Sequence, residues 1–336
     1  MTSGLTPRSW LITGVAGFIG SSLLEELLSR NQMVTGLDNF ATGHRSNLED
    51  VRRRVGPEAW QGFTFIEGAT TDPEAVARAC EGVDVVLHQA AVGSVPRSIK
   101  FPLKSQFANE VGFVTLLEAA KNAGVIRVVY ASSSSVYGDS PELPKVESRI
   151  GSPLSPYAAG KRANELYASV FGSCYGLECI GLRYFNVFGA RQDPNGAYAA
   201  VIPRWVDAMI TDGVVRINGD GLTSRDFCYV SNVVSMNLLA ATTERKEATG
   251  KVYNVGVGGQ TTLNDLFGLL RDNLSDHDIS YTREPEHDGF RPGDVQHSLA
   301  NVDRAKQLLG YDPKYSLEEG LKISVDWFVK NAQSKS

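Results

Sequence analysis

The stretch GVAGFIG, Gly14–Gly20, follows a short apolar run, SWLIT at Ser9–Thr13, and it decides the fold of the chain. The apolar run predicts a buried strand, and the leucines after the glycines recur at helical spacing. A second strand is predicted at Met33–Asp38 (MVTGLD), and it ends in an acid 24 residues after Gly14. Strand, glycine turn, helix, strand and terminal acid in this order predict a dinucleotide site.

The chemistry of this arrangement favours NAD as the dinucleotide. Glycines allow a tight turn and a close approach to a pyrophosphate, and the following helix N-terminus favours an anion. Asp38 can accept hydrogen bonds from a ribose, and its charge would repel the 2′-phosphate of NADP. A purely structural glycine turn is the alternative for the motif alone, and the flanking strands and acid argue against it.

Alternating strand and helix patterns continue beyond this unit. They predict an α/β fold: a Rossmann-like, doubly wound parallel sheet with a smaller, interleaved C-terminal substrate lobe. Ligands bind at the carboxyl ends of strands in such sheets, where the glycine turn, His88–Ala91 and Ser132–Ser135 are expected. The further predicted elements are strands Phe63–Glu67, Asp84–His88 and Arg127–Ala131, and helices Pro73–Cys80 and Ala108–Ala123.

The stretch SPYAAGKRANELYA, Ser155–Ala168, predicts a helix that begins after a serine cap and a proline. Tyr157 and Lys161 are four residues apart and share one helix face. A nearby ammonium is expected to lower the tyrosine pKa below about 10, which would make the phenol usable as a general base. The alternative is a tyrosine at a helix start with a solvated lysine. The serine run, with Ser133, favours the catalytic interpretation.

Composition excludes several classes of protein. A chain of 336 residues with net charge −5 has no basic field for nucleic acid. No apolar run approaches the ~18 residues of a membrane span, and no signal peptide is recognised. The four cysteines lack metal-like spacing and predict reduced thiols in a cytoplasmic protein, and the five histidines form no metal signature.

Together these motifs resemble the extended short-chain dehydrogenases/reductases, and within them the nucleotide-sugar 4-epimerases. The closest likeness is to bacterial UDP-N-acetylglucosamine/UDP-N-acetylgalactosamine 4-epimerases of polysaccharide pathways. The resemblance runs nearly end to end. Its segments are WLITGVAGFIG, LDNFATGH, HQAAVGSVPRS, SSSSVYGD, SPYAAGK, LRYFNVFGARQDPNGAYAAVIPRW, INGDGLTSRDFCYV and FRPGDVQHS.

The resemblance implies inversion of C4 of a UDP-hexose through a 4-keto intermediate. Tyr157 would be the catalytic base, Lys161 its electrostatic partner and Ser133 the hydroxyl that bonds the sugar O4. NAD would take the hydride and return it, so that the cofactor is regenerated in each cycle. The substrate would be UDP-GlcNAc or UDP-GalNAc, and UDP-Glc or UDP-Gal could also be accepted.

The resemblance also assigns binding residues by position. The cofactor set is Gly14, Gly17, Phe18, Ile19, Gly20, Asp38, Asn39, Phe40, Thr42, Gly43, Gln89, Ala90, Ala91, Asn109, Tyr157, Lys161, Tyr184 and Val187. The substrate set is Gly93, Ser94, Ser133, Ser134, Ser135, Asn186, Ala200, Val201, Asn218, Arg225, Arg291, Asp294 and Ser298. No metal is expected.

Ser298 bears on the size of the sugar. By the resemblance, it stands where a bulky tyrosine excludes N-acetyl sugars in enzymes restricted to glucose and galactose. Serine is smaller by a phenol ring, and the freed volume could accept a 2-acetamido group. The alternative is a surface serine without a role.

The chain departs from the family pattern at three positions. Ala69 stands where an acid usually bonds the adenine amino group, so NAD retention is expected to be weaker by about 0.5–1.5 kcal/mol. Gly160 and Arg162 flank Lys161 in place of a threonine and an aromatic residue, and the sequence does not explain the glycine, which costs ~1 kcal/mol in a helix.

Single features of the sequence or of the substrate distinguish the rival functions. A 4,6-dehydratase needs an acid pair where this chain has Ser134 and Ser135, which argues against elimination; a UDP-glucuronate decarboxylase is a further rival within the family. A UDP-hexuronic acid 4-epimerase stays open, because one substituent at C6 decides it. From a different class, a non-catalytic NAD-binding protein need not keep Ser133, Tyr157 and Lys161 together.

Residues 1–185 are expected to bind NAD, with 226–256 returning to that domain, and 186–336 to form mainly the UDP-sugar lobe. A homodimer is the family expectation, with Ala108–Ala123 and Ser155–Phe171 pairing across a two-fold axis. The remaining predicted elements are helices at Tyr198–Asp212, Asp226–Ala241, Leu263–Leu274 and Leu317–Val329, and a strand at Lys251–Val255.

Overall fold

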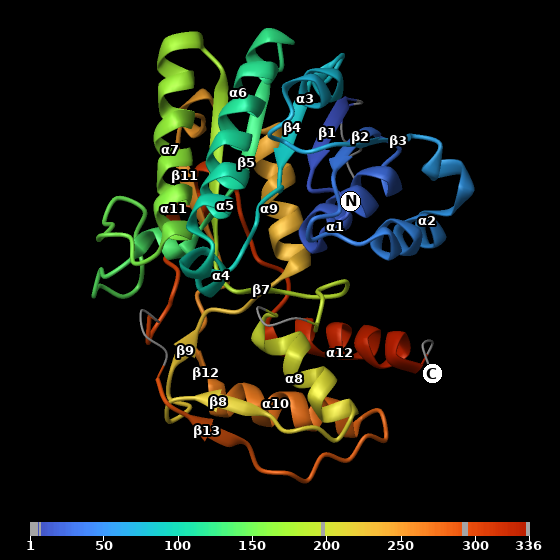
Figure 1. Ribbon diagram of the computed structural model, residues 1–336, viewed down its shortest axis with the longest axis vertical. Helices are drawn as coiled ribbons and strands as arrows, with labels where there is room; N and C mark the ends of the chain where they lie inside the picture. The colour runs from blue at the N-terminus through green and yellow to red at the C-terminus, as the bar shows by residue number, and fades with distance from the viewer. Residues whose placement is uncertain (1–5, 7, 196–198, 291–294, 334–336) are drawn as a thin grey trace.

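A seven-stranded parallel sheet forms the body of the molecule, in the order β11-β6-β5-β4-β1-β2-β3 (Figure 1). The computed structural model describes residues 6, 8–195, 199–290 and 295–333. The sheet strands are β1 (Ser9–Thr13), β2 (Met33–Asp38), β3 (Phe63–Glu67), β4 (Val85–His88), β5 (Arg127–Ser133), β6 (Glu178–Tyr184) and β11 (Val252–Val255). The fold is therefore the predicted Rossmann-like, doubly wound one.

Helices cover both faces of the sheet because successive strand residues point to opposite sides. Trp10 and Ile12 of β1 enter one apolar core, whereas Leu11 enters the other. The first core is covered by α1 (Phe18–Ser29), α2 (Arg45–Trp60) and α9 (Val230–Thr242). The second is covered by α3 (Pro73–Cys80), α6 (Gly112–Asn122) and α7 (Pro156–Tyr175).

A smaller lobe lies beyond the carboxyl ends of the strands, at the bottom of Figure 1. Its helices are α8 (Val201–Ile210), α10 (Leu263–Ser275) and α12 (Leu317–Gln333). Its paired strands are β8 (Arg216–Asn218) with β13 (Glu286–Asp288), and β9 (Ser224–Arg225) with β12 (Thr261–Thr262). Between these segments the chain returns to the body as α9 and β11, so the two parts are interleaved.

Several shorter elements lie between these helices and strands along the chain. They are α4 (Val95–Lys100), α5 (Pro102–Gln106), a π-helical turn at Phe107–Val111, α11 (Asp303–Leu309), and the pair of β7 (Val187–Phe188) with β10 (Cys228–Tyr229). No helix in the described part of the chain combines the length and apolar character needed to cross a bilayer.

Most predicted elements are present, and the differences have local causes. The helix predicted at Asp226–Ala241 begins only at Val230, because Cys228 and Tyr229 pair with β7 as a strand. The predicted Ala108–Ala123 helix is a π-helical turn followed by α6. The helix predicted from Tyr198 is described from Val201, since residues 196–198 lie outside the described part.

Candidate active site

The glycine turn between β1 and α1 forms one wall of a cleft of about 660 Å³ at the carboxyl edge of the sheet. Gly14 has φ +69°, and a Cβ there would lie 2.7 Å from the backbone nitrogen of Ala90. A Cβ on Gly20 would lie 2.1 Å from the carbonyl oxygen of Gly14. Only glycine fits these two positions, so the turn can bring its backbone close to a ligand.

Asp38 ends β2 in the same cleft and is almost buried. One carboxylate oxygen accepts a hydrogen bond from the Ala16 backbone nitrogen at 2.9 Å, and the other accepts from Phe40 at 2.8 Å. These bonds fix the carboxylate at the cleft wall, and each oxygen keeps a further lone pair for a ribose hydroxyl.

The structure brings eleven of the predicted cofactor residues together in this cleft. They are Gly14, Gly17, Phe18, Ile19, Gly20, Asp38, Asn39, Thr42, Gln89, Ala90 and Ala91. Two predicted residues pack beside the cleft: the Phe40 ring lies against Phe65, and Gly43 abuts Ala16. Val187 lies in a neighbouring cavity.

Two other predicted residues do not line the cleft but form hydrogen bonds with residues that do. The buried Asn109 side chain accepts from the Val92 backbone nitrogen at 2.7 Å and donates to the Val92 carbonyl at 3.1 Å. It therefore holds the loop after β4 and does not itself line the cleft. The Tyr184 hydroxyl donates to Gln89 Oε1 at 3.1 Å, which fixes a side chain that does line it.

A second cavity, of about 780 Å³, adjoins the cleft and holds the predicted catalytic side chains. Ser133, at the end of β5, and Tyr157, in the first turn of α7, both line it. Their side chains are hydrogen-bonded to each other. Ser133 Oγ also accepts from the backbone nitrogen and the hydroxyl of Ser135, at 3.2 and 3.0 Å, so its own proton is left for Tyr157 Oη.

The sequence predicted a lowered pKa for Tyr157, and this prediction is wrong. Burial raises the pKa of Tyr157 above its usual value, and the hydrogen bond with Ser133 opposes the rise. Desolvation outweighs the neighbouring groups because the phenolate would lose its hydration. A lower pKa therefore needs an additional positive charge beside the phenol.

Lys161 is fully inside the protein, beneath Tyr157. Its Nζ donates to the Ala131 carbonyl at 2.7 Å and lies 5.8 Å from the centroid of the Tyr157 ring. Burial lowers the pKa of Lys161 to about 8, and the charge of Glu165 opposes the shift. The lysine is therefore mainly a cation at neutral pH, held one helical turn from the phenol.

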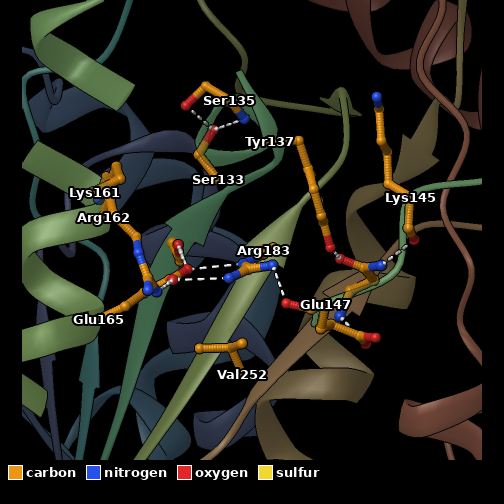
Figure 2. Close-up of polar contacts among 12 residues, drawn as sticks. Ser133, Ser135, Tyr137, Lys145, Glu147, Lys161, Arg162, Glu165, Arg183 and Val252 are labelled. Atoms are coloured by element: carbon orange, nitrogen blue, oxygen red, sulfur yellow. Dashed lines mark hydrogen bonds and ion pairs between the residues drawn. The ribbon is translucent and has the colours of Figure 1, made fainter. Parts of the chain in front are cut away.

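Glu165 anchors α7 to the sheet behind this pair (Figure 2). It forms a two-pronged ion pair with Arg183 of β6, at 2.8 Å for both contacts, and accepts from Ser132 at 2.7 Å. Burial alone would raise the pKa of Glu165, but the hydrogen bonds and charge of Arg183 lower it. Arg162, one of the departures from the family pattern, adds a third partner at 2.8 Å.

Glu165→Gln is expected to lower the free energy of unfolding by about 3–5 kcal/mol, because it leaves the buried Arg183 guanidinium without a counter-charge. Urea unfolding at one protein concentration measures the change. Asp326→Asn is the control: its pair with Lys330 is exposed on both sides and contributes only about 0.3–0.5 kcal/mol. Equal losses in the two variants would contradict the anchoring role.

The glycine beside Lys161 has a steric explanation in the structure. A Cβ on Gly160 would lie 2.9 Å from Glu110 Oε1 and 3.3 Å from Glu110 Cγ. Glu110 stands in the π-helical turn that packs against α7. Glycine at 160 therefore lets the Glu110 carboxylate keep this position, whereas a larger residue would displace the flexible end of that side chain.

The predicted substrate residues divide between the cavities. The 780 Å³ cavity is lined by Ser94, Ser133, Ser134, Ser135, Asn186, Arg225 and Ser298. A neighbouring cavity of about 260 Å³ is lined by Asn186, Ala200, Val201, Asn218 and Arg225, whereas Gly93 lies in the dinucleotide cleft. Arg291 and Asp294 lie outside the described residues.

Several lining residues were missed from sequence. Thr70, Arg97 and Lys104 line the dinucleotide cleft, and Lys145 lines the 780 Å³ cavity. Arg97 and Lys104 belong to the short helices α4 and α5, and Lys145 to an irregular stretch. Thr70 follows the predicted strand Phe63–Glu67, so the rule that located the other candidates could have found it. Arg97, Lys104 and Lys145 do not directly follow a predicted strand, so that rule could not find them.

With this geometry in view, the chain matches the model of the NAD-dependent epimerase/dehydratase family over residues 10–256. It belongs to that family. Its cofactor is accordingly NAD, and the cleft fits it: Gly14 and Gly20 leave a cradle that a Cβ would fill, and Asp38 is placed to accept hydrogen bonds.

Known relatives match this chain over nearly its whole length. A UDP-glucose 4-epimerase of Mycolicibacterium smegmatis is 36% identical over 96% of this chain and 99% of its own. A UDP-N-acetylglucosamine 4-epimerase from Methanobrevibacter ruminantium, solved with UDP-N-acetylmuramic acid, is 36% identical with TM-score 0.88 over 97% and 100% of the two chains. A UDP-glucuronic acid 4-epimerase from Bacillus cereus, solved with UDP-glucuronic acid and NAD, is 28% identical with TM-score 0.85 over 96% and 99%.

Proposed function

We propose that this chain is an NAD-dependent 4-epimerase that interconverts UDP-GlcNAc and UDP-GalNAc through a 4-keto intermediate, with UDP-Glc and UDP-Gal as further substrates. The observation that carries the proposal is the small side chain of Ser298 in the wall of the cavity that also contains Ser133 and Tyr157. Serine leaves room there for a 2-acetamido group. A relative named as a UDP-N-acetylglucosamine 4-epimerase, at 36% identity, supports the same substrate class.

The chemistry requires a proton to leave O4 and a hydride to leave C4, and the hydride must return to the other face of C4 while the proton returns to O4. Tyr157 Oη takes the proton of the 4-hydroxyl and gives it back, while the Ser133 hydroxyl holds O4. Lys161 provides positive charge 5.8 Å from the centroid of the Tyr157 ring. Bound NAD supplies a reversible hydride acceptor. Since one Tyr157 serves both faces, the keto sugar must turn within the cavity, which needs free volume around the ring.

The diphosphate is proposed to lie where the two substrate cavities meet. Asn186 and Arg225 line both of them. A guanidinium suits phosphate oxygens because it presents several donors in one plane. Uridine would then extend toward Ala200 and Asn218. In this scheme residues 1–185 with 226–256 hold NAD, and residues 186–336 hold most of the UDP-sugar.

The proposal is tested by giving the purified protein UDP-GlcNAc and UDP-Glc in parallel, without added NAD, and identifying the products. Formation of UDP-GalNAc, faster than UDP-Gal, is the expected result. Turnover of UDP-Glc alone would keep the 4-epimerase chemistry and overturn the substrate assignment. No product from either sugar, with or without added NAD, would overturn the proposed function.

Ala69→Asp is expected to tighten NAD binding by about 0.5–1.5 kcal/mol, or roughly 2- to 12-fold in Kd. Ala69 lines the dinucleotide cleft beside Thr70, where a carboxylate can accept a hydrogen bond from the adenine amino group. The measurement is the Kd for NAD together with the amount of NAD retained on purification. Ala332→Asp, which adds the same charge near the end of α12, is the control. Equal affinity in the wild type and the Ala69 variant would contradict this account.

A homodimer through α6 and α7 is also proposed. These helices lie side by side in Figure 1, and the segments around them expose apolar side chains at spacings of four residues. The exposed residues are Leu103, Phe107, Val111, Leu166 and Val170. Exposed apolar side chains gathered on neighbouring elements are typical of an interface between subunits. Light scattering should return twice the chain mass of 36.4 kDa, and a monomer would overturn the proposal.

A further inference from the structure

Lys145 lines the 780 Å³ cavity. The residue is only 3% exposed. Its Nζ donates one short hydrogen bond to the carbonyl oxygen of Ser140. An ammonium has three donors, and this carbonyl uses one of them. Figure 2 shows the Lys145 side chain extending away from Glu147 and Arg183.

The carboxylates around Lys145 have other partners. Glu142 acts on the Lys145 charge, but it is exposed and forms an ion pair with Arg149 at 3.0 Å. Glu147 accepts from the Asn254 backbone nitrogen at 3.0 Å and lies near Arg304. The residues described in the cavity wall include Lys145 and Arg225 and no acid. A buried cation in this position favours an anionic ligand.

The backbone fixes Lys145 beside Ser298. The Lys145 nitrogen donates to the Leu299 carbonyl at 2.7 Å, and the Lys145 carbonyl accepts from the Asn301 nitrogen at 3.0 Å. Lys145 and Ser298 therefore belong to one wall, whereas Ser133 and Tyr157 come from β5 and α7. Substituents of a hexose whose 4-hydroxyl meets Tyr157 would face this wall.

The two cations of the cavity have different positions. Arg225 also lines the adjoining 260 Å³ cavity, where the nucleotide end of the substrate is proposed to lie. Among the described lining residues, Lys145 belongs to the cavity that contains Tyr157 and not to the 260 Å³ cavity. The diphosphate charge is thus matched by Arg225, which leaves Lys145 for an acid on the sugar ring.

We propose that Lys145 binds a carboxylate on the hexosyl ring, and that the preferred substrates are acidic N-acetylhexosamines, the UDP-N-acetylhexosaminuronates. This inference rests on the proposed 4-epimerase function and refines its substrate class. A carboxylate would accept the donors that Ser140 leaves open, whereas the neutral C6 hydroxymethyl group could not offset the charge. The epimerisation at C4 is unchanged, since the carboxylate takes no part in it.

The test compares kcat/KM for UDP-GlcNAc and for UDP-N-acetylglucosaminuronic acid in the wild type and in Lys145→Met, which keeps the length of the side chain without its charge. The wild type should favour the acid. In Lys145→Met the ratio of acid to neutral kcat/KM should fall roughly 10- to 100-fold, mainly through KM. Lys145→Arg should restore much of the ratio. Lys330→Met, on the surface of α12, is the control for loss of one positive charge.

An unchanged ratio in Lys145→Met, or a wild type that epimerises UDP-GlcNAc and not the acid, would overturn the inference. Calorimetric measurement of the binding of the two sugars distinguishes a failure of this inference from a failure of the proposed function. If neither sugar is epimerised but the acid binds more tightly and loses that advantage in Lys145→Met, the 4-epimerase proposal fails while Lys145 remains a carboxylate site. Thermal melts show whether the variants are folded. If Lys145→Met does not fold, Lys145→Gln replaces it in both measurements.

Discussion

Tyr157→Phe is expected to lower kcat for 4-epimerisation roughly 10²- to 10⁴-fold, while NAD and the UDP-sugar still bind. The substitution removes only the hydroxyl that exchanges the O4 proton, because the ring stays in its place at the start of α7. KM should therefore change much less than kcat. Steady-state rates together with equilibrium binding of the substrate measure the two effects separately.

The matched control is Tyr167→Phe, which removes a hydroxyl from an exposed tyrosine of the same helix. Its kcat should be close to that of the wild type. A Tyr157 variant with near-normal kcat would mean that another group carries the proton. Ser133→Ala then becomes informative, since Ser133 is the hydroxyl bonded to Tyr157 and the next candidate to serve the sugar.

The raised pKa of Tyr157 sets a condition on this chemistry. Burial disfavours the phenolate, and Lys161, at 5.8 Å from the ring centroid, does not overcome that effect. A cationic nicotinamide ring bound beside the phenol would shift the pKa downward. We therefore expect Tyr157 to become an effective base only in the complex with oxidised NAD, so that NAD binding should release protons near neutral pH.

The sequence predicted the sheet well where one local pattern was sufficient. β1, β2 and β3 have the predicted bounds because each is a short run between clear turn signals. It missed α2, a polar helix that is kinked at Gly56 and carries Pro57. It also missed β6, whose Gly181 interrupts the apolar run. That glycine is required by packing, since a Cβ there would lie 2.6 Å from the Tyr130 hydroxyl.

The candidate site could be predicted from sequence where its residues follow strands. The glycine turn, Asp38 and Ser133 follow strands, so their common edge can be read from the chain order. Lys145 reaches the cavity through backbone pairing with residues 299 and 301, which are far from it in sequence. Likewise, the pKa of Tyr157 depends on how much protein covers the phenol. The position of Lys145 and the pKa of Tyr157 both result from tertiary packing, which cannot be read from local sequence patterns.

Ser298→Tyr is expected to lower kcat/KM for UDP-GlcNAc and UDP-GalNAc roughly 10- to 100-fold and to affect UDP-Glc and UDP-Gal much less. Ser298 is 8% exposed, and its backbone nitrogen donates to the Ser224 carbonyl at 3.1 Å, so its position is fixed. A phenol ring added there must occupy the cavity. Overfilling a packed site costs about 1–3 kcal/mol, and each 1.4 kcal/mol is a tenfold change.

The contrast between the two substrate pairs is what makes this prediction specific. A plain hexose carries a hydroxyl at C2, which needs far less volume than an acetamido group, so the added ring should discriminate between them. Ser298→Ala removes the hydroxyl without filling the cavity, and its preference for acetamido sugars should resemble that of the wild type. If Ser298→Tyr lowers turnover of all four sugars equally while its thermal melt is unchanged, the cavity is blocked in general. The small side chain at position 298 would then not be what admits the acetamido group.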